Sequence, residues 1–74
     1  MSRRSRNEYE ASSMPYDHKR CVRETLAYAG TSMLEFANRN GLSADAVDLG
    51  NVSLRTVHED TGVSYDKMIE LGRN

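Results

Sequence analysis

The stretch that decides the fold is TVHEDTGVSYDKMIEL, which covers residues 56–71. Val57 lies in a segment whose apolar residues have helical spacing, and Gly62 can adopt the left-handed backbone that a tight turn needs. Ser64 stands where a cap for a following helix belongs, and Met68 can pack back against the first segment. The pattern predicts two short helices that are joined at Gly62.

A similar pattern occurs 21 residues earlier, in the stretch 33–50. There Gly41, Ser43 and Val47 take the places that Gly62, Ser64 and Met68 take in the later stretch. Gly50 falls where Leu71 closes the later pattern, so the second helix of the earlier copy is expected to be short. The sequence therefore predicts two helix–turn–helix corners with the same turn chemistry.

The stretch 54–71 resembles the helix-turn-helix family, and the stretch 33–50 resembles it more weakly. The resemblance implies a second helix that reads DNA bases in the DNA-binding members. The family prefers a small residue where its two helices approach most closely. Ala37 meets this preference in the earlier copy, but His58 takes the position in the later one and would push the helices apart or point outward. Which of the two stretches forms the genuine unit stays open.

The rest of the chain also predicts short helices. The apolar residues between Cys21 and Ala29 fall on one helical face, with Ser13 as a cap and Gly30 as the stop. Ser32 and Glu35 have the spacing of a capping box. No segment has the character of a paired strand. We therefore predict an all-α fold, a compact helix-turn-helix-like bundle of four or five short helices over residues 13–74, preceded by a flexible basic arm over residues 1–12.

Length and composition exclude several classes of protein. The chain has 74 residues, a mass of 8.3 kDa and one cysteine. These values exclude large enzyme scaffolds and a framework of intramolecular disulfides. No apolar run approaches the roughly 20 residues of a membrane span, and no apolar core follows the first arginines as in a signal peptide. We therefore expect a cytoplasmic protein that does not enter a membrane.

Charge is divided unevenly along the chain. Residues 1–23 have a net charge of +3, and residues 24–74 have a net charge of −4. A basic front thus precedes an acidic body, although the total is only −1. Such a division matters for the choice of partner, because the charge of a surface steers association.

Catalytic and metal-binding patterns are missing from the sequence. His18 and His58 have no second histidine or cysteine at metal-ligand spacing, and Cys21 lies on an apolar helical face. Glu59 and Asp60 are expected on a solvated helix face. We predict a protein that is not an enzyme and that uses no cofactor, metal or small-molecule substrate.

The basic front is the predicted site for a protein partner with an acidic surface. Arginine pairs well with carboxylates, and tyrosine is a frequent anchor at interfaces. The size and the charge division are similar to those of small bacteriophage host-takeover proteins, some of which bind bacterial RNA polymerase. That resemblance implies a transcription regulator that inhibits RNA polymerase in the cytoplasm of a bacterial host. The candidate partner-binding residues are Arg3, Arg4, Arg6, Tyr9, Tyr16, Lys19, Arg20 and Arg23.

Sequence-specific DNA binding, for which one short helix would supply too little contact without dimerisation, is the alternative hypothesis. Its candidate residues are Ser64, Tyr65, Lys67 and Arg73, while the arm would hold phosphates. Both candidate reading helices are acidic or neutral, and most affinity for DNA comes from neutralising phosphates. The protein-partner hypothesis is therefore preferred. A third hypothesis, an interaction module or antitoxin-like inhibitor without a link to transcription, stays open.

Overall fold

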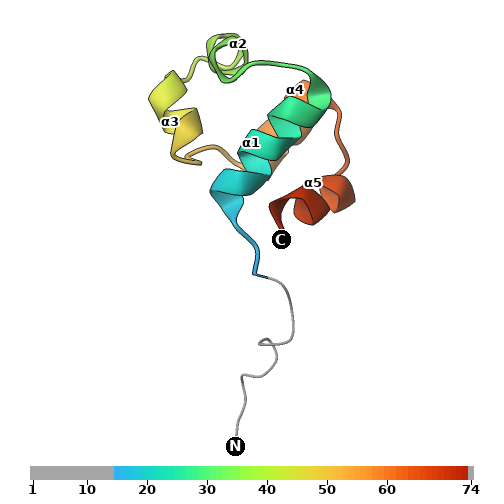
Figure 1. The fold of residues 1–74 in the computed structure, drawn as a ribbon. Helices are drawn as coiled ribbons and strands as arrows, with labels where there is room; N and C mark the ends of the chain where they lie inside the picture. Colours follow the sequence, from blue (N-terminus) through green and yellow to red (C-terminus); the bar gives the residue numbers. More distant parts are fainter. Residues whose placement is uncertain (1–14, 74) are drawn as a thin grey trace, which may run out of the picture.

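The computed structural model describes residues 15–73, and within these residues the chain forms five α-helices and no strand (Figure 1). The helices are α1 (His18–Ala29), α2 (Met33–Arg39), α3 (Ala44–Asp48), α4 (Leu54–Thr61) and α5 (Tyr65–Gly72). The prediction of an all-α bundle of short helices is confirmed. The proposed arm, residues 1–12, lies outside the described residues.

The longest helix, α1, begins later than the sequence suggested. Its cap is Asp17, whose carboxylate accepts a hydrogen bond from the backbone N–H of Arg20 at 3.1 Å. Asp17 thus takes the role expected of Ser13, and Ser13 lies outside the described residues. The helix ends at Gly30, whose φ of 78° is the left-handed conformation that glycine adopts without strain.

Serine caps begin the other four helices, as the sequence predicts. The capping box is present in full: Glu35 N–H donates to Ser32 Oγ at 3.0 Å, and Ser32 N–H donates to Glu35 Oε1 at 3.3 Å. The other three caps are Ser43, Ser53 and Ser64. Each cap satisfies a backbone N–H that has no partner within its own helix.

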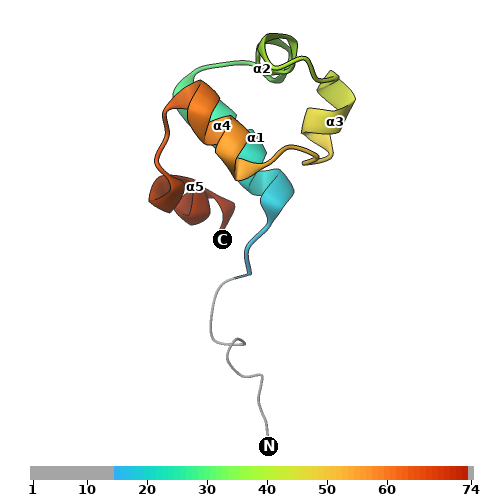
Figure 2. The same cartoon turned by 180° about the vertical axis from the view of Figure 1, so that it is seen from behind.

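Helix α1 lies at the centre of the molecule (Figures 1 and 2). Helix α4 packs along it, α2 and α3 lie together on one side, and α5 lies on the other. The buried apolar residues come from all five helices and from the α4–α5 turn. They are Cys21, Val22, Leu26, Phe36, Ala37, Val47, Val57, Val63 and Met68.

The closest seam in the fold joins α1 to α5. Cys21 Sγ donates to the carbonyl of Met68 at 3.1 Å, and Asp17 N–H donates to the carbonyl of Gly72 at 2.9 Å. Gly72 is buried and belongs to α5, whereas the sequence suggested a helix that ends at Leu71. This seam fixes the beginning of α1 against the end of α5.

Candidate binding surface

The beginning of α1 and the end of α5 meet at one end of the molecule. Tyr16 and Arg73 pair there as an isolated antiparallel bridge, next to the hydrogen bond from Asp17 to Gly72. The structure thus places Arg73, a candidate for DNA binding, beside Tyr16, a candidate for the protein partner. One member of each of the two sets of candidate residues thus lies at this end of the fold.

Three further cations lie on the first two turns of α1. Lys19 and Arg23 are exposed, and Arg20 is partly exposed. The ion pairs found within residues 15–73 involve other cations. Lys19, Arg20, Arg23 and Arg73 therefore have no carboxylate of these residues within 4.0 Å. We call Lys19, Arg20, Arg23 and Arg73 the basic face.

Tyr16 and His18 fix the entry of the chain into α1. Tyr16 Oη lies 2.9 Å from His18 Nδ1, and His18 Nε2 lies 2.7 Å from the carbonyl of Val52. A carbonyl only accepts, so Nε2 carries the proton and Nδ1 accepts from the Tyr16 hydroxyl. Burial of that hydroxyl, with a contribution from Cys21, raises the pKa of Tyr16 well above its usual range and keeps it a donor. The Tyr16 side chain therefore has a structural role, although 41% of the residue is exposed.

Two of the four candidates for DNA binding, Ser64 and Tyr65, are engaged within the protein. Ser64 Oγ accepts the backbone N–H of Lys67 at 3.2 Å. The Tyr65 ring stacks on the His58 imidazole, with 4.4 Å between their centroids. His58 Nδ1 in turn lies 2.7 Å from the carbonyl of Val63. His58 therefore does not point outward, because the carbonyl in the turn and the tyrosine ring hold its imidazole.

The solvent-facing sides of α3 and α5 carry negative charge. Asp66 and Glu70 are exposed on α5, and Asp45 and Asp48 are exposed on α3. These are the second helices of the two predicted helix–turn–helix corners, and they are the helices that would face DNA if either corner bound it. A phosphate backbone would meet carboxylates at both places.

A cleft that the sequence did not suggest lies at the other end of α1. Its volume is about 350 Å³, and the last turn of α1, the α4–α5 turn and Lys67 form its walls. The Lys67 ammonium lies 5.0 Å from the centre of the Tyr28 ring. Tyr28 and Lys67 are far apart in the sequence, so no local pattern could have revealed their contact.

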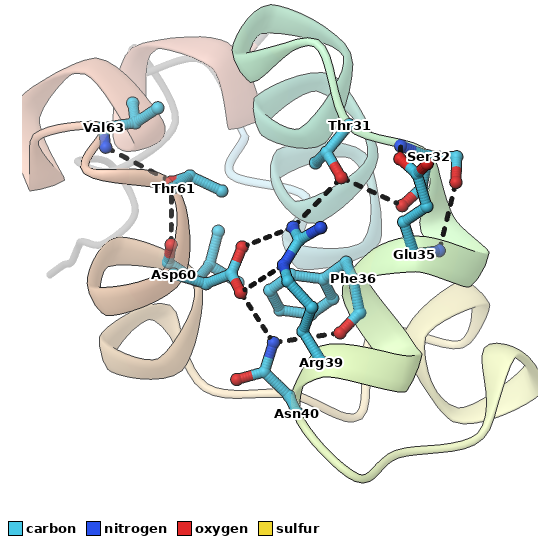
Figure 3. A network of polar contacts seen from close by, with 10 residues as sticks. Thr31, Ser32, Glu35, Phe36, Arg39, Asn40, Asp60, Thr61 and Val63 are labelled. Atoms are coloured by element: carbon cyan, nitrogen blue, oxygen red, sulfur yellow. Dashed lines mark hydrogen bonds and ion pairs between the residues drawn. The ribbon is translucent and has the colours of Figure 1, made fainter.

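A polar cluster ties α2 to α4 (Figure 3). Arg39 donates to both carboxylate oxygens of Asp60, at 2.8 and 3.0 Å, and also to Thr31 Oγ1 at 3.0 Å. Asn40 Nδ2 donates to Asp60 at 3.0 Å and to the carbonyl of Phe36 at 2.9 Å. The expectation that Asp60 lies on a solvated face is wrong, because its side chain is only 9% exposed. The paired guanidinium lowers the pKa of Asp60.

The remaining sequence candidates have no place in the described part of the chain. Arg3, Arg4, Arg6 and Tyr9 lie outside residues 15–73. Within that range no three histidine, cysteine or acidic side chains gather as metal ligands, and no helix is long and apolar enough to cross a membrane. Comparison with known proteins finds no matching family model, no matching curated protein and no matching solved structure.

Proposed function

We propose that this protein is a non-enzymatic regulator of transcription that binds an acidic surface of a protein partner through its basic face. One observation carries the proposal. Four cations lie where α1 begins and α5 ends, and none of them forms an ion pair within 4.0 Å with a carboxylate of residues 15–73. In the sequence, Arg3, Arg4 and Arg6 precede these residues and carry three more positive charges.

Arginine side chains suit such a partner. A guanidinium can donate two parallel hydrogen bonds to one carboxylate, which adds geometric specificity to the attraction. Opposite charge on two surfaces mainly raises the association rate and makes it depend on salt. The proposed partner belongs to the transcription machinery, and RNA polymerase is the first candidate. The reason is that the size and the charge division of this chain resemble those of bacteriophage host-takeover proteins.

The negative charges on α5 oppose DNA binding, so this hypothesis is less favoured than the protein-partner hypothesis. Asp66 and Glu70 occupy the exposed side of the helix that would enter the groove, while Ser64 and Tyr65 are engaged internally. A DNA complex would bring these carboxylates close to phosphates. Most of the affinity for DNA comes from neutralising phosphates, so this arrangement opposes binding.

The test compares association rates with immobilised bacterial RNA polymerase over a series of salt concentrations. The triple variant K19A/R20A/R23A is expected to associate at least about tenfold more slowly at low salt and with a weaker salt dependence. Arg55→Ala is the matched control. Arg55 is an exposed cation on α4 that already pairs with Glu59 at 3.1 Å, so its loss should leave the rate unchanged.

Two results would contradict the proposal. One is the absence of binding to the polymerase by the unaltered protein. The other is unchanged binding by a sixfold variant, in which Arg3, Arg4 and Arg6 are replaced by alanine in addition to the three substitutions of K19A/R20A/R23A. A gel-shift measurement with duplex DNA at low salt completes the test, because a shift that requires Lys67 and Arg73 would favour the DNA hypothesis.

A further inference from the structure

The cleft at the end of α1 is separate from the basic face and is not explained by it. It is lined by Tyr28, Ala29, Thr61, Gly62, Val63, Ser64 and Lys67. Helix α1 has 12 residues, so the cleft lies about 18 Å from the beginning of α1, at 1.5 Å per residue. The basic face lies on the first two turns of α1 and at the end of α5, and Arg23 is its member nearest to Tyr28 in the sequence.

Most polar groups in the cleft already have partners. The Thr61 hydroxyl donates to the carbonyl of Val57 at 2.7 Å and accepts the N–H of Val63 at 3.2 Å. The Ser64 hydroxyl accepts the N–H of Lys67. These hydrogen bonds stabilise the α4–α5 turn, so the two hydroxyl groups serve the fold before they could serve a ligand.

The Lys67 ammonium is the group that lacks a strong partner. It makes no hydrogen bond within residues 15–73, and its nearest carboxylate oxygen, on Glu70, is 3.6 Å away. Glu70 is itself 71% exposed, and pairs of this kind contribute little. The Lys67 side chain is 34% exposed, as for a lysine that packs its hydrocarbon stem against the protein and keeps its ammonium in contact with water.

Tyr28 supplies the apolar wall of the cleft. The residue is 62% exposed, and its ring lies beneath the ammonium of Lys67. A ligand that fits must carry a negative charge for the ammonium and a short hydrocarbon stem for the ring. The side chain of glutamate or aspartate has this chemistry, and a cleft of about 350 Å³ is large enough for one such side chain.

We infer that the cleft binds an acidic side chain of the same partner segment that the basic face attracts. This inference rests on the proposed function and adds a second contact point to it. A partner segment would run along the exposed side of α1, from Arg20 and Arg23 past Ala27 to Tyr28. Glu24 and Glu70 border this path, so the incoming carboxylate must displace Glu70 from Lys67 and pass Glu24. The cleft would therefore fix the position along α1 at which an acidic residue of the partner binds.

The experiment is an NMR titration of ¹⁵N-labelled full-length protein at low salt, in which the chemical shifts of the backbone amides are measured. The probe is an acetylated and amidated octaglutamate peptide, and its octaglutamine counterpart is the uncharged control. Sodium phosphate distinguishes a partner side chain from a free anion. Lys67→Met removes the charge but keeps the hydrocarbon stem over Tyr28, and Lys19→Met makes the same change on the basic face.

The expected result is a saturable shift of the amides of residues 62–67 with octaglutamate and none with octaglutamine. Lys67→Met should weaken the affinity measured at these amides about fivefold, the upper range for a partly exposed ion pair. Lys19→Met should leave that affinity nearly unchanged.

Three outcomes would overturn the inference: shifts only around residues 19–23, equal losses in the two variants, or an equal response to phosphate. The first of these would leave the proposed function standing, because the basic face would still bind the acidic peptide. Shifts in residues 62–67 without any in residues 19–23 would instead count against the proposed function.

Discussion

At the scale of single residues, Gly72 is where α5 comes closest to α1. A Cβ at this position would lie 2.7 Å from Cys21 Cβ and 2.7 Å from Tyr16 Cε1. Both distances are far shorter than a normal contact between carbon atoms. Neither neighbour can move away easily, because Cys21 lies on the central helix and Tyr16 is fixed by its bond to His18.

Replacing Gly72 by alanine is therefore expected to destabilise the protein. Within a helix this change normally stabilises by up to about 1 kcal/mol, but overpacking at a close approach costs about 1–3 kcal/mol. We expect the second effect to dominate and the midpoint of urea unfolding to fall. Glu70→Ala, on the exposed side of the same helix, should change the free energy of unfolding by no more than about 0.5 kcal/mol. An increased midpoint for Gly72→Ala would contradict the close approach of α5 to α1.

At the scale of elements, Arg39 and Asp60 connect the two helix-turn-helix-like corners. Arg39 stands at the end of α2 and Asp60 near the end of α4, so their bidentate pair joins helices from different corners. Asn40 and Thr31 complete the cluster (Figure 3). The pair is therefore a direct polar link between the two corners, in addition to the core that they share around α1.

The Asp60 carboxylate should make stability depend on pH in the acid range. Folding lowers the pKa of Asp60. Its carboxylate therefore stabilises the folded protein fully at pH values above the ordinary pKa of an aspartate, which is about 4. The effect is lost as the pH falls through the lowered value in the folded protein. Asp60→Asn should unfold more readily in urea at pH 7 and should lose less stability than the unaltered protein between about pH 4 and pH 2.

The matched control for this prediction is Glu59→Gln. Glu59 is the adjacent acidic residue, and it pairs with Arg55 on an exposed side of α4, where such pairs contribute little. Urea unfolding at several pH values distinguishes the two positions. Equal effects of the two substitutions would show that Asp60 is no more important than a surface carboxylate.

At the scale of the whole molecule, α1 is the element on which the other helices assemble. Its thiol, Cys21, is fully buried at the seam with α5. The chain has no other cysteine. Access of a reagent to this one sulfur therefore reports the separation of α1 from α5.

Labelling of Cys21 with a thiol-reactive disulfide reagent should be slow under native conditions. In the folded protein it should proceed at least about a thousandfold more slowly than in urea, because only the open fraction reacts. Gly72→Ala should accelerate native labelling by the factor by which it raises that fraction. Rapid labelling of the unaltered protein without denaturant would show that the seam between α1 and α5 is not formed.

The local structure follows from the sequence by itself. Ser32, Ser43, Ser53 and Ser64 cap the helices that the sequence predicted, and Gly30 and Gly62 end helices in the left-handed conformation. Caps and turns depend on hydrogen bonds between residues two to five positions apart, so their chemistry is visible in a short stretch. The division of charge into a basic front and an acidic body is likewise a property of the sequence.

The contacts between residues that are distant in the sequence depend on how the helices pack. This packing buried the Asp60 side chain against Arg39, brought Arg73 beside Tyr16, placed Lys67 over the Tyr28 ring, and made Gly72 a contact with α1. The residues of each pair are separated by 21 or more positions, and local patterns do not encode how helices cross. The packing of α1 against α4 and α5 determines those crossings, and with them the positions of the basic face and the cleft.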